Sequence, residues 1–113
     1  MNVVSKNLIL TVSNGVCNIT PHAGKRTVAL LEHLAETIVV SVDTSRSVVG
    51  DHLVLIVKRD NTDDWGLVFS AENGVFFTSC RTPETEVYSP NNNTWIGNFY
   101  FDGTYFCNTY EDC

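Results

Sequence analysis

The chain has 113 residues and a formal net charge of −6, with only 7 lysines and arginines. This length favours a single domain spanning residues 1–113. The negative charge and the scarcity of cations argue against nucleic acid and against an anionic membrane as partners, because both are bound through clustered Lys and Arg side chains.

The first ten residues, MNVVSKNLIL, lack the basic region and continuous apolar run of a signal peptide. The longest apolar run, Leu53–Val57, is too short to span a bilayer, and the run Ile38–Val40 is shorter still. We therefore expect a soluble chain without a leader. The four cysteines match no zinc or redox motif, and free thiols are favoured over the alternative disulfide pairings: Cys17, Cys80, Cys107 and Cys113.

Three two-residue turn signals, Asn14-Gly15, Asn73-Gly74 and Asp102-Gly103, lie between runs typical of β-strands. Each suits a tight hairpin turn in which both central residues have positive φ. The first hairpin would set Val12 opposite Cys17 and Leu10 opposite Ile19, with Cys17 pointing into the core.

The segment at residues 26–36 is ambiguous, because its apolar spacing fits either a helical face or a strand that ends near Leu31. We favour the strand. Thr37–Asp43 predicts a strand by its β-branched content. Val49–Asp60 predicts a long central strand that is covered on both faces, because Leu53, Leu55 and Val57 alternate with Val54 and Ile56.

The two later hairpins follow from the same turn rule. The second would pair the run around Leu67 and Phe69 with the run ending at Cys80, and Val87-Tyr88 would form a short edge strand. The third would set Phe99 opposite Phe106 and Trp95 opposite Tyr110 in the core. Tyr100 and Tyr105 would then be neighbours on the opposite face, where tyrosine suits a contact surface.

No nucleophile elbow, phosphate loop, zinc motif or carboxylate pair is present, so we expect no catalytic residue, no metal and no cofactor. A Cys17/His22 dyad is disfavoured because the hairpin register turns Cys17 into the core. The acidic run at Asp60–Asp64 lacks the spacing of an EF-hand loop and favours a solvated turn. The chain is therefore not expected to be an enzyme.

These elements predict an all-β fold, a single antiparallel β-sandwich of jelly-roll-like or Ig-like form built from hairpins. The Gly50-Asp51 turn, the alternating strand of Leu53, Leu55 and Val57, and the closing run Phe101–Tyr105 resemble small β-sandwich domains of tailed-bacteriophage virion proteins. Such domains include capsid decoration or auxiliary proteins, head fibres and tail-fibre modules.

The resemblance implies a non-enzymatic virion structural protein, assembled in the host cytoplasm, that binds a major capsid or appendage protein. It also implies a homo-oligomer, with a trimer favoured. The alternative is a carbohydrate- or receptor-binding module, since aromatic side chains on a β face can stack on sugars. The candidate contact residues are Tyr88, Tyr100 and Tyr105, whereas Trp95 is expected to pack in the core.

Overall fold

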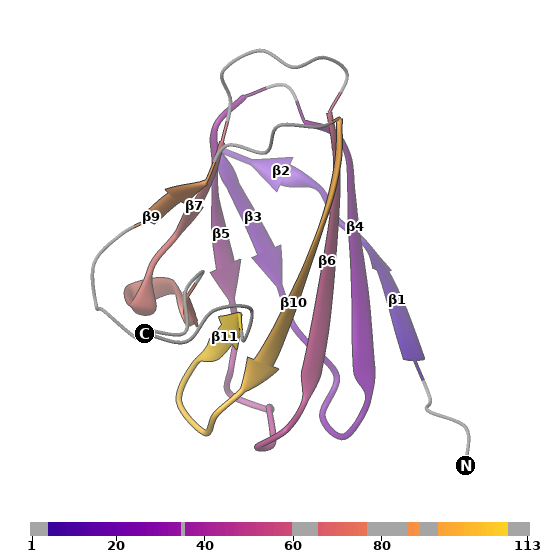
Figure 1. The fold of residues 1–113 in the computed structure, drawn as a ribbon, viewed down its shortest axis with the longest axis vertical. Helices are drawn as coiled ribbons and strands as arrows, with labels where there is room; N and C mark the ends of the chain where they lie inside the picture. The colour runs from indigo at the N-terminus through magenta and orange to yellow at the C-terminus, as the bar shows by residue number, and fades with distance from the viewer. Residues whose placement is uncertain (1–4, 35, 60–65, 77–85, 89–92, 109–113) are drawn as a thin grey trace.

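A computed structural model describes residues 5–34, 36–59, 66–76, 86–88 and 93–108. They form two β-sheets packed face to face (Figure 1). The six-stranded sheet contains, in spatial order, β1 (Ser5–Ile9), β4 (Arg26–Leu34), β6 (His52–Arg59), β10 (Thr94–Phe101), β11 (Phe106–Asn108) and β8 (Val75–Phe76). The five-stranded sheet contains β2 (Val12–Ser13), β3 (Val16–Ile19), β5 (Ile38–Val42), β7 (Leu67–Phe69) and β9 (Glu86–Tyr88).

The prediction of an antiparallel sandwich built from hairpins is wrong, because both sheets are mixed. From β3 to β7 the chain places each successive strand in the opposite sheet. Strands that are two apart in the sequence therefore become parallel neighbours, as in the pairs β3/β5, β4/β6 and β5/β7. β1 also pairs in parallel with β4. Neither a jelly-roll nor an Ig arrangement describes this order of strands.

The connection from β4 to β5 shows why a short turn here does not make a hairpin. The register between β4 and β6 shifts between Leu31 and Leu34, and His33 within this stretch has a φ of 58°. A left-handed residue in a bulge re-aims the strand. The chain therefore arches over into the other sheet. The strand expected from residue 26 is confirmed, and it extends to Leu34 instead of ending near Leu31.

The first predicted hairpin is confirmed only at its tip. Asn14 and Gly15 have φ values of 53° and 75°, as this turn type requires, and Val12 lies opposite Cys17. Leu10 does not pair with Ile19. Its N–H instead donates to the carbonyl of Leu30 at 2.8 Å, because β1 belongs to the six-stranded sheet and β2 to the other.

The second predicted hairpin does not form. After β7 the chain makes a short 3-10 helix, η1 (Ala71–Asn73), and Gly74 has a φ of 80°. The next strand, β8, then joins the six-stranded sheet beside β11. Cys80, at the end of the predicted second run, lies outside the described residues. The predicted edge strand at Val87-Tyr88 is confirmed as β9, at the edge of the five-stranded sheet.

The third hairpin forms with a longer turn than predicted. Phe101 lies opposite Phe106, so Phe99 faces Asn108 and not Phe106. The carboxylate of Asp102 accepts hydrogen bonds from the N–H groups of Thr104 and Tyr105, both at 2.8 Å. An Asp side chain that binds the amides of its own turn stabilises a wider loop. Phe99 and Phe106 are both buried, as predicted.

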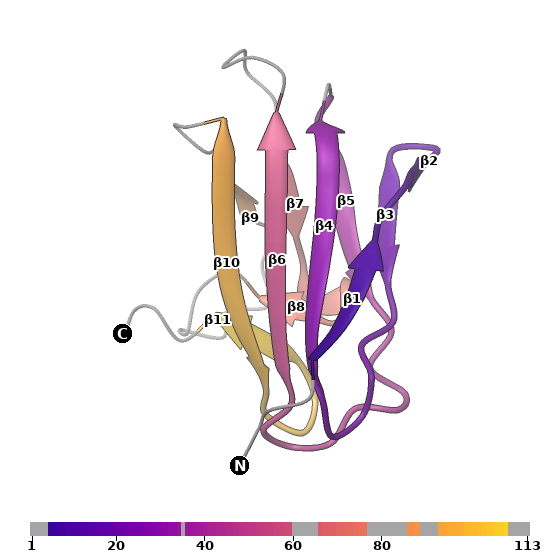
Figure 2. The ribbon, with the colours of Figure 1, turned by 90° about the vertical axis from the view of Figure 1, so that its right-hand side faces the viewer.

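The core lies between the sheets and is built by alternate residues of each strand. In β6 the buried residues are Leu53, Leu55 and Val57, each about 1% exposed. Val54 and Ile56 are only half-buried, so the expectation that both faces of this strand are covered is wrong. The opposite face of the six-stranded sheet is turned to the outside (Figure 2).

Candidate binding surface

The outward side chains of four neighbouring strands form a continuous apolar row. Ile9 of β1 lies beside Leu30 of β4, Leu30 beside Ile56 of β6, and Ile56 beside Ile96 of β10. The adjacent row contains Val28 and Val54, which are also paired. We call these six residues the apolar stripe: Ile9, Val28, Leu30, Val54, Ile56 and Ile96.

The apolar stripe is open to solvent on the described part of the chain. Ile9 is 73% exposed and Ile96 is 57% exposed, and the four residues between them are half-buried by their neighbours in the sheet. Figure 2 shows β10, β6, β4 and β1 from this side, with no other described strand in front of them. Large isoleucines that line up across an uncovered sheet are typical of a binding surface.

A polar cluster lies at one end of the apolar stripe. The rings of His52 and Tyr100 stack with their centroids 4.4 Å apart and an interplanar angle of 10°. His52 Nε2 and the side-chain oxygen of Asn98 are 2.9 Å apart, within hydrogen-bond distance. Tyr100 is 39% exposed. The cluster fixes the orientation of the tyrosine ring, and His52 occupies one of its two faces.

The structure separates the three tyrosines that sequence reasoning grouped as contact residues. Tyr100 points outward as predicted, but Tyr105 lies in the turn after β10 and is half-buried. Tyr88 belongs to β9 of the other sheet, and its side chain lies outside the described part. Tyr100 and Tyr105 are not cross-strand neighbours as predicted, because the longer turn places Cys107 opposite Tyr100. That these tyrosines contact a partner stays a prediction.

Sequence reasoning missed the apolar stripe although its signal was present. Val54 and Ile56 make β6 apolar on both faces, and Val28 and Leu30 do the same for β4. Such strands are usually buried on both sides in parallel sheets. Here the second apolar face points outward, and only the register between strands shows that these residues form one row with Ile96.

The conceivable Cys17/His22 dyad has no support from the side-chain environment of its cysteine. Cys17 is 1% exposed, and burial raises the pKa of its thiol to about 11. A buried thiol with a high pKa is a poor nucleophile. His22 lies in the loop after β3 and is half-buried. Cys17 and Cys107 form no disulfide with each other in the described part of the chain, whereas Cys80, Cys113 and the acidic run 60–64 lie outside the described residues.

The described residues contain neither a metal-binding cluster nor a membrane-spanning helix. No group of three or more His, Cys, Asp and Glu side chains comes together there in a way that could hold a metal ion. Within the same residues, no helix has the length and apolar character needed to cross a membrane.

Comparisons with family models, with curated proteins and with solved structures found no match to this chain.

Proposed function

We propose that the chain is a non-enzymatic structural protein of a virus particle, which attaches to a shell or appendage protein through the outer face of its six-stranded sheet. The observation that carries this proposal is the apolar stripe across β1, β4, β6 and β10. The particle itself is suggested by the resemblance to bacteriophage β-sandwich domains. Assembly in the host cytoplasm is part of the same proposal.

The dimensions of this face suggest attachment of modest strength for each copy. β1, β4, β6 and β10 have 5, 9, 8 and 8 residues. With strands about 4.8 Å apart and a rise of about 3.3 Å per residue, they cover roughly 500 Å² in projection. A standard stable interface buries about 800 Å² on each partner. Burying an exposed isoleucine contributes roughly 1.5 to 3 kcal/mol. Many copies on a regular shell would add to the overall affinity through multivalency.

The test is to purify virus particles from cultures that produce the chain and to measure its amount in the particle fraction by immunoblotting. The proposal expects the chain in a constant ratio to the major shell protein. Ile96→Lys should reduce that ratio at least about tenfold, because a buried unpaired charge is costly. Ser13→Lys adds the same charge on β2, in the other sheet, and should leave the ratio unchanged. Particles without the chain would contradict the proposal.

The proposal includes a homo-oligomer, with a trimer favoured, and light scattering after size exclusion tests it. Both cysteines in the described part of the chain, Cys17 and Cys107, are buried, so we expect neither to link copies through a disulfide that reductant would break. If the apolar stripe binds the shell, the Ile96→Lys variant should have the same oligomeric mass as the natural chain. If Ile96→Lys lowered the oligomeric mass and also abolished shell binding, the apolar stripe would join copies of the chain instead.

The second candidate is a carbohydrate-binding module, and the His52–Tyr100–Asn98 cluster is the observation that favours it. An exposed aromatic ring beside an amide is a common arrangement for holding a sugar. His52 already stacks on one face of Tyr100, which leaves the ring one face for a ligand. Binding on a glycan array that Tyr100→Ala abolishes would support this function, and an array without binding would count against it.

A further inference from the structure

A groove lies beside β1, where the edges of the two sheets part. β1 is the edge strand of the six-stranded sheet, and β2 pairs with β3 only at Val16 and Cys17. The space between β1, the end of β3 at Asn18 and the loop after β3 has a volume of about 570 Å³. Buried Leu10 and Pro21 and half-buried Leu8 form its floor, and its rim includes Asn18, His22 and Arg46.

The backbone of β1 offers unused donors to this groove. The N–H of Leu10 donates to the carbonyl of Leu30, so the backbone N–H of Leu10 points toward β4. Successive N–H groups of a strand point to opposite sides. The N–H groups of Lys6 and Leu8 therefore point toward β4, and those of Asn7 and Ile9 point toward the open edge. Among the described strands, only β4 pairs with β1.

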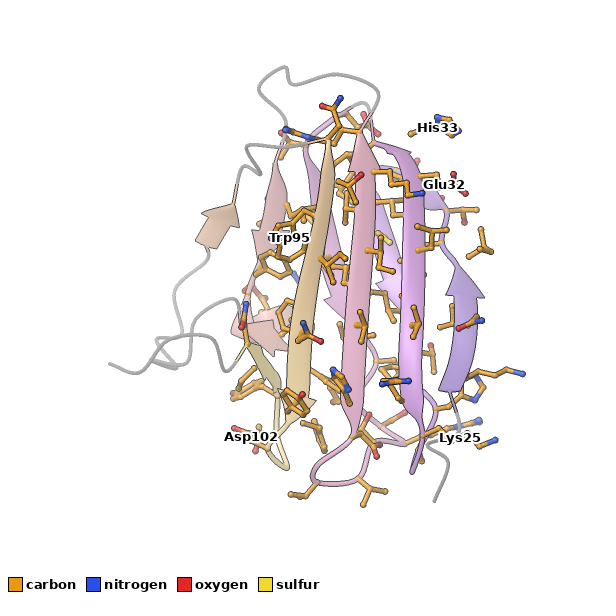
Figure 3. All side chains as sticks on the ribbon, turned by 45° about the vertical axis from the view of Figure 1, so that its right-hand side comes forward. Lys25, Glu32, His33, Trp95 and Asp102 are labelled. Carbon is orange, nitrogen blue, oxygen red and sulfur yellow. The ribbon has the colours of Figure 1, made fainter. Side chains whose placement is uncertain are left out.

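Lysine and arginine side chains gather at this groove although the chain has a net charge of −6. Arg46 lines it, and Lys6, just outside it, shares the inner side of β1 with Leu8 by strand alternation. Lys25 lies at the same end of the molecule, below β1, as Figure 3 shows.

Two carboxylates at this end already have hydrogen-bond partners. Asp51 is buried and accepts the N–H groups of Gly24 and Val48. Asp43 accepts the N–H of Ser45 and also interacts with Arg46, so it offsets part of that charge. Arg46 on the rim and the lysines beside it, Lys6 and Lys25, favour an incoming carboxylate.

We propose that this groove binds an extended peptide segment with carboxylate side chains, which pairs with β1 as an added strand. Edge strands with open donors accept such strands, and alternate side chains of the segment would fill the groove. A second copy of β1 fits less well, because it would bring two such groups of cations together. This inference does not depend on the proposed attachment through the apolar stripe, apart from sharing Ile9.

The experiment begins with a yeast-displayed library of random twelve-residue peptides selected on the full chain. We expect the enriched peptides to alternate apolar with other residues and to contain Asp or Glu. One enriched peptide is then synthesised and its binding is measured by fluorescence anisotropy. A selection that enriches nothing, or that enriches basic peptides, would overturn the proposal.

Two variants at Asn7 distinguish the contribution of its backbone N–H to peptide binding from that of its side chain. Asn7→Pro removes an N–H that points to the open edge of β1, whereas Asn7→Ala keeps it and removes only the side chain. We expect Asn7→Pro to weaken peptide binding at least about tenfold and Asn7→Ala to weaken it less than about threefold. Arg46→Glu, on the exposed rim, should also weaken binding at least about tenfold. Equal binding by all of these variants would contradict the strand-addition model.

Hydrogen exchange provides a readout that needs no substitution. In the unbound chain the amide of Leu8 should exchange slowly, and those of Asn7 and Ile9 should exchange fast. Bound peptide should slow Asn7 and Ile9 at least about tenfold. Tight peptide binding without this protection would show that the peptide lies elsewhere, and it would overturn the proposal while leaving the shell-attachment test untouched.

Discussion

At the scale of single residues, burial determines the reactivity of the Cys17 thiol. Cys17 lies on β3 with its side chain between the sheets, beside a core of aliphatic and aromatic side chains. The ionised form of a thiol is strongly disfavoured there, so the pKa of Cys17 rises to about 11. The cysteine therefore behaves as a small apolar residue and contributes to packing.

The raised pKa of Cys17 predicts a loss of stability in alkaline solution. The unfolded chain loses this proton near the ordinary thiol pKa of about 8.5, whereas the folded chain keeps it until about pH 11. As pH rises between these values the unfolded state is favoured, so the free energy of unfolding falls. Urea unfolding from pH 7 to pH 10.5 measures this fall.

Cys17→Ala is the control for that experiment. It lowers stability at every pH because it removes a buried sulfur, but it should also make the alkaline fall smaller than in the natural chain. All other ionisable groups are the same in both proteins, so the difference between the two curves isolates Cys17. Two parallel curves would contradict the prediction.

At the scale of elements, the loops at one end of the sandwich are held together by a buried carboxylate. Asp51 precedes β6 and is 7% exposed. One of its oxygens accepts the N–H of Gly24 at 3.0 Å, in the loop before β4, and the other accepts the N–H of Val48 at 2.9 Å. This residue therefore joins two of the loops that carry the chain from one sheet to the other.

Asp51→Ala should lower the free energy of unfolding by roughly 2 to 4 kcal/mol, because two loop amides lose a charged acceptor. Asp51→Asn keeps one acceptor oxygen and should cost less. Asp43→Ala is the matched control, since its carboxylate is exposed and water can replace it, and its effect should be much smaller than that of Asp51→Ala. Urea denaturation measures all three, and equal effects of Asp51→Ala and Asp43→Ala would refute this role.

At the scale of the whole molecule, the alternation between sheets makes most strand pairs distant in the sequence. β1 pairs with β4, β4 with β6 and β6 with β10. Such pairs form only after long loops close, and the entropy cost of loop closure slows folding. The long central strands β4, β6 and β10 must all be in place before the core is covered (Figure 1).

We therefore expect refolding on the order of 1 to 100 s⁻¹, slower than a hairpin-built or helical chain of this size. Stopped-flow dilution from urea, followed by tryptophan fluorescence, measures the rate. Complete refolding within a millisecond would contradict this topology.

The amino-acid sequence by itself determined the local structure. It predicted the strands at β4, β5 and β6, the Asn14-Gly15 turn, the burial of Cys17, and the core side of Phe99 and Phe106. These features depend on alternation, β-branched content and glycine, which act over a few residues.

Only the tertiary structure decided which strands pair. Hairpin rules assume that neighbours in sequence become neighbours in a sheet, but the bulge at His33 and the crossing after β7 send the chain to the other sheet. The apolar stripe and the groove beside β1 both arise from this pairing. Each contains side chains or backbone groups from strands far apart in the sequence, so no local pattern could place them together.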